Sequence, residues 1–186
     1  ILSNQNNHEN SLQNDMIGNE KTIGSEIFIR RKNKQINGWI AYQFNNTDYS
    51  FNDSQYYSAN HDITHEFKSV MMTSILDYDF TATWSYSSGR VYTHSDEINI
   101  TNDFQIFYNN GNRNKERLEP VHHLDISISK SYTLNYLQLN VGLSIYNIYN
   151  KKNISHKRYN PYSLEYIISD VVMLGFTPTF FIQASL

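Results

Sequence analysis

Apolar and polar residues alternate strictly along several stretches of the chain. Between Phe80 and Tyr86, one face carries Phe, Ala, Trp and Tyr, and the other carries threonine and serine. Segments 123–129, 137–145 and 180–186 alternate in the same way. A period of two is typical of half-buried β-strands, and no segment has a comparable helical stripe. The pattern therefore predicts an all-β, antiparallel fold.

The alternating segments and the breaks between them predict seven strands. The predicted ranges are 24–32, 36–51, 63–76, 79–93, 121–134, 137–155 and 165–186. We expect one long final strand, because proline is tolerated at sheet edges and bulges. A break between Gly175 and Pro178 would instead raise the count to eight. Residues 1–23 are polar and are predicted to form an extracellular loop or a disordered lead-in.

The connections between these strands alternate between two kinds. Short turns are expected at 33–35, 77–79 and 135–136, and longer polar connections at 52–62, 93–120 and 156–163. Several predicted strands exceed the usual length of about 5–6 residues. Long strands with short turns at one end and long loops at the other favour a transmembrane β-barrel. A soluble antiparallel sandwich remains the alternative interpretation.

Tyrosines are abundant near the ends of the predicted strands. In a barrel they would suit the aromatic girdles at the two membrane surfaces. The residues are Tyr42, Tyr49, Tyr86, Tyr92, Tyr132, Tyr146, Tyr149 and Tyr166.

Composition excludes several other classes of protein. No stretch approaches the roughly 20 apolar residues of a transmembrane helix. The chain has no cysteine, which excludes disulfide scaffolds and thiol chemistry, and its net charge of −3 gives no reason to expect nucleic acid as a partner. The first 20 residues lack the pattern of a signal peptide and the chain lacks an initiator Met, so we expect it to be processed or cut from a longer polypeptide.

Four segments occur in a suggestive order along the chain. They are Gly38–Tyr42 (GWIAY), Tyr86–Thr93 (YSSGRVYT), His122–Ser127 (HHLDIS) and Leu143–Asn153 (LSIYNIYNKKN). Together they resemble the C-terminal barrel portion of TonB-dependent outer-membrane receptors, particularly the Bacteroidota type. The resemblance covers roughly residues 24–186. Two positions depart from the family pattern, because Leu186 stands where an aromatic residue is usual and Val91 replaces a common proline.

The resemblance implies a 22-stranded barrel that encloses an N-terminal plug and imports a nutrient such as a siderophore, cobalamin, a peptide or a glycan. Residues 24–186 would then be the last seven strands of this barrel, in the outer membrane of a Gram-negative bacterium. The implied partners are the rest of the barrel and its plug, the TonB–ExbB–ExbD complex, outer-membrane lipid and a surface lipoprotein.

Seven strands cannot close a bacterial single-chain barrel, which has an even number of strands from eight upward. An open sheet in lipid would leave two edges with unpaired backbone groups, each costing several kcal/mol. We therefore expect the edge strands 24–32 and 165–186 to pair with strands outside this segment.

Several polar groups could hold a metal or a ligand, but each has a plainer interpretation. His122, His123 and Asp125 cannot all converge on a metal, because adjacent strand residues face opposite sides. His61, Asp62, His65 and Glu66 are expected to be structural or solvated. The same holds for the loop carboxylates Asp48, Asp53, Asp96, Glu97 and Asp103. Arg113, Lys115 and Arg117, with Glu116 and Glu119, are expected to form a solvated loop or a patch facing lipopolysaccharide.

No motif for catalysis is found, so we expect neither an enzyme nor a cofactor, and no residue is assigned to substrate binding. Three other functions stay open. The chain could be a small eight-stranded outer-membrane protein with a structural or adhesive role, or a soluble sandwich that binds carbohydrate through tyrosine and tryptophan. An outer-membrane phospholipase is the most distant alternative.

Overall fold

The computed structural model describes residues 18–33, 36–51, 55–100, 106–110, 113–159 and 168–185. The regular secondary structure of these residues is β-strand, as the alternation predicts. Among them, no helix is long and apolar enough to cross a membrane.

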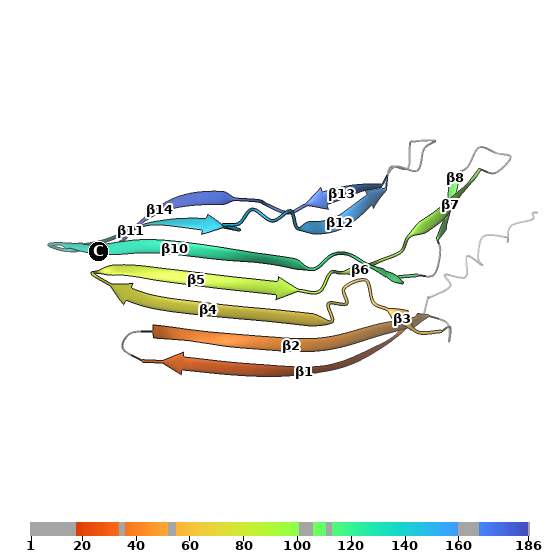
Figure 1. Ribbon diagram of the computed structural model, residues 1–186, viewed down its shortest axis with the longest axis horizontal. Helices are drawn as coiled ribbons and strands as arrows, with labels where there is room; N and C mark the ends of the chain where they lie inside the picture. Colours follow the sequence, from red (N-terminus) through yellow and green to blue (C-terminus); the bar gives the residue numbers. More distant parts are fainter. Residues whose placement is uncertain are drawn as a thin grey trace, which may run out of the picture.

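Seven strands form one antiparallel sheet in which each strand lies beside the next one along the chain (Figure 1). In spatial order they are β1 (Gly18–Lys32), β2 (Ile36–Phe51), β4 (His65–Ile75), β5 (Tyr78–Ser87), β10 (Val121–Leu134), β11 (Leu137–Tyr146) and β14 (Thr177–Ser185). The two edges of the sheet are β1 and β14, which are not paired with each other. The predicted count of seven long strands is confirmed, and no closed barrel forms within the described residues.

Short strands gather at one end of this sheet (Figure 1). They are β3 (Tyr57–Ser58), β6 (Val91–Tyr92), β7 (Ser95–Ile100), β8 (Ile106–Asn110), β9 (Glu116–Arg117), β12 (Ile154–Tyr159) and β13 (Ile168–Val172). β3 adds to β2, and the others form the pairs β6–β9, β7–β8 and β12–β13. The tight connections β1–β2, β4–β5 and β10–β11 all lie at the opposite end. We call the two ends the loop end and the turn end.

Several predicted strand boundaries are wrong. The ranges 36–51 and 121–134 are correct, but β1 already begins at Gly18, inside the predicted lead-in. The strand predicted at 63–76 is slightly shorter. The strand predicted at 79–93 ends at Ser87, because the backbone leaves the sheet at Gly89, where a Cβ would overlap the Leu118 carbonyl oxygen. Residues 1–17 lie outside the described residues.

The last two predicted strands are also interrupted. The strand predicted at 137–155 ends at Tyr146, since Asn147 has a positive φ of 51° and turns the chain out of the sheet. The strand predicted at 165–186 breaks between β13 and β14, where the Phe176 N–H donates to Asn150 Oδ1 at 2.8 Å. The break adds no strand to the main sheet, because β13 pairs with β12 instead.

The cross-strand register divides the sheet into an apolar and a polar face. Ala82 pairs with Met71 on one side and with Ile126 on the other, and Ile126 pairs with Ile145. One residue along, Thr81 pairs with Ser127, which faces the opposite side. Ala82, Trp84 and Tyr86 on β5 share the apolar face with Leu139, Val141 and Leu143 on β11. Thr83, Ser85, Gln138 and Asn140 lie on the other.

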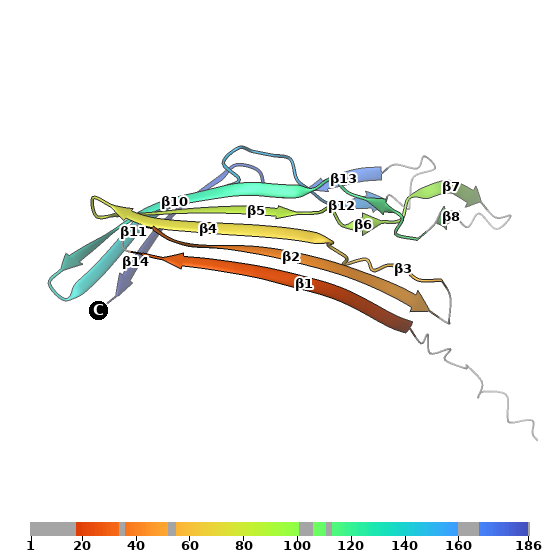
Figure 2. The ribbon, with the colours of Figure 1, turned by 60° about the horizontal axis from the view of Figure 1, so that its bottom comes forward.

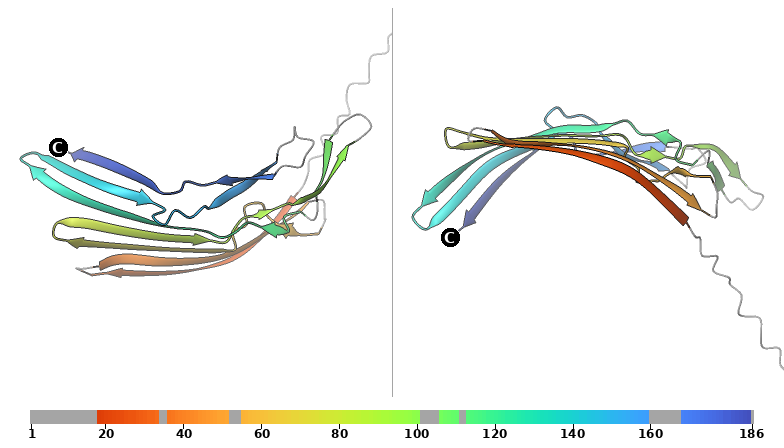
Figure 3. Two further views of the ribbon diagram at one scale, coloured as in Figure 1. Left: turned by 45° about the horizontal axis from the view of Figure 1, so that its top comes forward. Right: turned by 90° about the horizontal axis from the view of Figure 1, so that it is seen from below.

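The sheet is a single layer with no apolar core of its own (Figures 2 and 3). Among the described residues, the buried apolar side chains are Ala59, Val91 and Leu118, all at the loop end. Most of the exposed large apolar side chains of the long strands share the apolar face. They include Ile27, Ile29, Ile36, Ile40, Met71, Ile75, Phe80, Leu143, Phe180 and Ile182.

The turn between β4 and β5 generates a stability prediction. Leu76 and Asp77 both have positive φ, 51° and 64°, as a type I′ hairpin turn requires. Leucine is disfavoured there by about 1 kcal/mol, and Leu76 is 85% exposed, so its replacement loses little packing. Leu76→Asn should raise the free energy of unfolding by about 1 kcal/mol in urea. Leu76→Val should lower it, and equal stability of the two variants would contradict this turn geometry.

Candidate functional site

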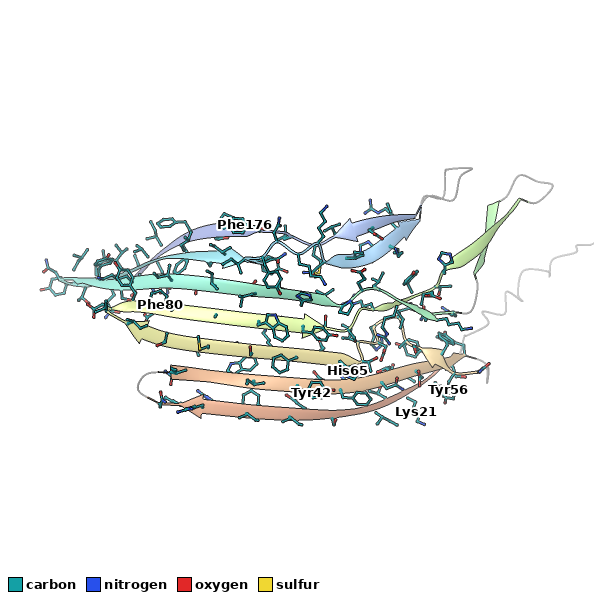
Figure 4. The ribbon with its side chains drawn as sticks, in the orientation of Figure 1. Lys21, Tyr42, Tyr56, His65, Phe80 and Phe176 are labelled. Carbon is teal, nitrogen blue, oxygen red and sulfur yellow. The ribbon has the colours of Figure 1, made fainter. Side chains whose placement is uncertain are left out.

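The apolar face carries a row of rings near the loop end. Tyr42 stacks on His65 with ring centroids 6.2 Å apart, and Figure 4 labels both, with His65 at the loop end of β4. Trp84 packs against Phe67 at 5.3 Å and against Tyr86 at 6.2 Å. These rings come from three adjacent strands and form a continuous aromatic row. We call it the loop-end row.

A second, smaller aromatic group lies on the same face at the turn end. It consists of Tyr78 on β5 and Tyr132 on β10, and the Lys130 ammonium lies near both rings. From Tyr78 to Tyr86, β5 extends over eight residue steps, which is about 26 Å at the usual rise of a strand. The side chains between the two groups on this face are predominantly apolar.

Not all predicted girdle tyrosines belong to these groups. Tyr42, Tyr86 and Tyr132 lie on the apolar face, but register places Tyr49 and Tyr146 on the polar face. Tyr149 lies in the loop after β11, and Tyr166 falls outside the described residues. The sequence indicates strand ends for these residues, but the face depends on a register that only the pairing fixes.

The polar face contains a hollow of about 330 Å³ near the loop end. It lies over the small side chain of Ala41. Around it are two carboxylates, an amide, a lysine, a histidine and an indole, contributed by Glu26, Glu66, Gln43, Lys68, His123 and Trp39. The Lys68 ammonium lies 6.0 Å from the Trp39 ring centroid. This mixture of charges and hydrogen-bonding groups makes the hollow hydrophilic and suited to contact water and polar solutes.

The adjacent histidines separate as strand geometry predicts. His123 lies on the polar face, and its Nδ1 is 2.9 Å from Asp125 Oδ1. His122 lies on the apolar face, where its Nδ1 is 2.8 Å from the Tyr149 hydroxyl. Asp125 Oδ1 also accepts the Asn147 N–H at 2.9 Å, so this carboxylate anchors the chain as it leaves β11.

The second group that the sequence suggested, His61, Asp62, His65 and Glu66, does not converge on one site either. Asp62 is buried at the loop end, His65 contacts Tyr42 on the apolar face, and Glu66 lines the polar hollow. His61 Nε2 lies 3.7 Å from Glu20 Oε1. In the part of the chain that the structure describes, no three histidine or carboxylate side chains are placed to hold a metal ion.

Asp62 forms the central contact between three connections at the loop end. Its side chain is fully buried, and Oδ2 lies 2.7 Å from Arg117 Nη2. Oδ1 accepts the Thr47 N–H at 3.0 Å, and Oδ2 accepts the Thr64 hydroxyl at 3.0 Å. Burial alone would raise the pKa of Asp62, but these hydrogen bonds and the charge of Arg117 hold the pKa below its ordinary value.

The cluster predicted at 113–117 is therefore only partly a solvated loop. Arg117 also donates to the Gly89 carbonyl at 2.7 Å, which ties β9 to the connection after β5. The Arg113 guanidinium lies 4.9 Å from the Tyr57 ring centroid. Lys115 and Glu116 are exposed, as expected. Among the predicted loop carboxylates, Asp48 accepts a hydrogen bond from Asn46, while the positions or side chains of Asp53, Asp96, Glu97 and Asp103 fall outside the description.

Three asparagines spaced three residues apart hold the other side of the loop end. Asn147, which is fully buried, donates to the Lys151 carbonyl and accepts the Lys151 N–H. Asn150 accepts the Phe176 N–H. Asn153, also buried, bonds the N–H and the carbonyl of His122. The Asn-rich segment 143–153 thus connects the loop ends of β10, β11 and β14 through hydrogen bonds, and we call these three asparagines the clamp.

Comparison with known proteins gives no match: no family model, no curated protein and no solved structure is significantly similar to this chain.

Removal of the Asp62 carboxylate should destabilise the connections at the loop end. Asp62→Asn leaves the Arg117 guanidinium without its counter-ion, and we expect a loss of about 2–3 kcal/mol, near the low end for a buried pair because Arg117 is one-third exposed. Hydrogen exchange over residues 55–64 and 113–118 should accelerate. Glu119→Gln, an exposed change in the same connection, should have no effect.

The same contact predicts a dependence on pH. Because the folded pKa of Asp62 lies below the unfolded value of about 3.9, its stabilisation is fully present above that value and is lost as the pH falls through the folded pKa. Protection from exchange, corrected for the intrinsic pH dependence of amide exchange, should therefore fall in the wild type only at acidic pH, and Asp62→Asn should remove that part of the dependence. An unchanged pH profile in the variant would contradict this role.

Proposed function

We propose that this chain is a wall segment of a transmembrane β-barrel in the outer membrane of a Gram-negative bacterium. It would supply the last strands of a TonB-dependent receptor that imports a nutrient such as a siderophore, cobalamin, a peptide or a glycan. The observation that carries the proposal is the sheet itself. One face is apolar between two aromatic groups, the other is polar, and no second layer of described residues covers either face.

The dimensions of the apolar face support a membrane location. A barrel in the outer membrane has an apolar band about 25 Å tall between aromatic girdles. At the usual strand tilt of about 35–45°, the distance of about 26 Å along β5 from Tyr78 to Tyr86 spans about 20 Å of height, which is comparable with this band. The short turns at one end and the long connections at the other also match the usual asymmetry of such barrels.

The open edges support a partial wall. β1 and β14 each have one side without a partner strand in the described residues. In lipid each unpaired backbone group would cost several kcal/mol, so further strands have to complete the barrel. The receptor class comes from the sequence resemblance. In such a receptor, the polar face would line the lumen around the plug. The hollow at Glu26, Glu66 and Lys68 would then belong to the lumen wall.

The alternatives fit less well. A soluble sandwich needs a second sheet over its apolar face, and the described strands form one layer. A closed eight-stranded barrel needs β1 and β14 to meet through one more strand, whereas the views in Figure 3 place them at opposite edges of an open arch.

A pair of adjacent substitutions tests which face meets lipid. Ile126 and Ser127 are neighbours on β10 and face opposite sides of the sheet, and Ile126 pairs with Ala82, midway between Tyr78 and Tyr86 on β5. Ile126→Arg in the complete protein should lower the free energy of unfolding in lipid vesicles by about 2–4 kcal/mol, because this position lies near the middle of the apolar band. Ser127→Arg should cost much less, because its side chain faces the polar side. Equal losses at the two positions would contradict the membrane location.

The receptor class is tested separately. The complete reading frame should contain a plug domain before these strands, and deletion of the gene should abolish uptake of one nutrient to the same extent as deletion of TonB. A complete frame without a plug would refute the receptor class and leave the membrane wall intact.

The incomplete wall gives a further prediction. Residues 1–186 expressed alone should aggregate or fail to insert into vesicles, because both sheet edges would be exposed to hydrocarbon. The complete protein should insert and show a heat-dependent shift in gel mobility. A monodisperse, heat-modifiable monomer formed by these residues alone would favour the eight-stranded alternative.

A further inference from the structure

Lys130 is an isolated charge on an apolar surface. Lys130 is the only Lys, Arg, Asp or Glu on the apolar face of β4, β5, β10, β11 and β14. In the register, Lys130 lies between Tyr78 on β5 and Val141 on β11. Its ammonium forms no ion pair with any described carboxylate. A cation in this position is costly unless a counter-charge reaches it from outside the chain.

The surroundings of Lys130 hold its ammonium in a defined place. Nζ lies 4.6 Å from the Tyr78 ring centroid and 5.7 Å from that of Tyr132, distances typical of cation–π contacts. The hydroxyl groups of both tyrosines are without a hydrogen-bond partner among the described residues. One cation and two hydroxyl donors therefore lie together at the turn end. This combination suits a phosphate group, which accepts several hydrogen bonds.

An apolar groove begins next to this group. Its volume is about 300 Å³, and it lies between β4, β5, β10 and β11 over the small side chain of Ala82. Its outward-facing lining consists of Met71, Thr73, Phe80, Ile126, Ile128, Leu143 and Ile145. Phe80 lies two residues after Tyr78 on β5, and its partner Ile128 lies two residues before Lys130 on β10, so the groove extends from the cationic group toward the middle of the apolar face. Figure 4 labels Phe80 near the turn end.

We propose that Lys130, Tyr78, Tyr132 and the adjacent groove form a binding site for a phospholipid of the turn-end leaflet. The phosphate contacts Lys130 and the two hydroxyls, and one acyl chain lies in the groove. The distance from Lys130 to Ile126, four residues along β10, is about 13 Å, close to the depth of half the apolar band. A phospholipid is favoured because it joins an anionic phosphate to apolar acyl chains in this order.

This inference rests on the proposed membrane location of the apolar face and adds a specific ligand to it. The experiment uses the complete protein, purified in detergent after insertion has been shown by its heat-dependent gel mobility. Native mass spectrometry then measures adducts with phosphatidylglycerol and with diacylglycerol of the same acyl chains. Wild type should retain phosphatidylglycerol at lower lipid concentrations, and inorganic phosphate should not displace it.

Three variants separate the contributions of the charge and the groove. Lys130→Gln should weaken phosphatidylglycerol binding about fivefold, the factor that corresponds to about 1 kcal/mol per lysine near a lipid surface, with diacylglycerol binding unchanged. Lys32→Gln is the matched control, since Lys32 lies at the same end but on the polar face, and it should have no effect. Ala82→Phe fills the groove and should weaken binding of both lipids.

The outcomes are distinguishable. If the complete protein fails to insert, the membrane proposal itself is refuted. If it inserts but binds both lipids equally, or if Lys130→Gln and Lys32→Gln behave alike, the phosphate site is refuted and the membrane location stands. If Ala82→Phe binds both lipids as wild type does, the groove is not where the acyl chain lies.

Discussion

The cross-strand register is the constraint on which the rest of the structure depends. In a β-sheet, a shift of one residue in a single pairing moves every side chain of that strand to the opposite face. Here the register from β2 to β14 keeps Ile40, Met71, Ala82, Ile126 and Val141 on one side. The apolar face, its aromatic boundaries and the polar wall behind it all follow from this alignment. The proposed membrane location accounts for an apolar face that the described residues leave uncovered.

The loop end fixes this register through buried polar contacts instead of an apolar core. Asp62 and Arg117 connect three segments that are distant in sequence, and Asn147 and Asn153 connect β10 with β11 and the chain beyond it. Buried polar groups are costly unless satisfied, and these have hydrogen-bond partners. Among the described residues, the turn end has no comparable network. The register there depends on tight turns, because the type and length of a turn set the pairing of the two strands that it joins.

Much of the fold follows from local sequence, because a strict period of two is a local signal. β2 and β10 were predicted with their correct bounds, and the facing of Ala82 and Thr83 follows from alternation alone. The interruptions at Gly89, Asn147 and Asn150 depend on contacts with residues far along the chain, and the alternation could not reveal them. The spacing of three between Asn147, Asn150 and Asn153 was a signal that could have indicated the clamp.

The candidate site residues were harder to predict for the same reason. Strand geometry correctly separates His122 from His123, but the buried contact between Asp62 and Arg117 joins positions 55 residues apart. Lys130 was visible as the one charge on the apolar face of its strand. Its contacts with Tyr78 and Tyr132 require the register between β5 and β10, which sequence alone does not give.

The most direct test of the proposed membrane wall is solvent accessibility along β5 in the complete protein after its insertion into vesicles. Residues 1–186 contain no cysteine, so once any cysteine elsewhere in the complete protein has been replaced, spin labels can be placed one at a time at positions 80–85. Paramagnetic relaxation by oxygen, which concentrates in hydrocarbon, should be strong at positions 80, 82 and 84. Relaxation by a water-soluble nickel chelate should be strong at 81, 83 and 85. Equal relaxation at neighbouring positions, or access of the chelate to positions 82 and 84, would contradict the proposal that the apolar face meets lipid.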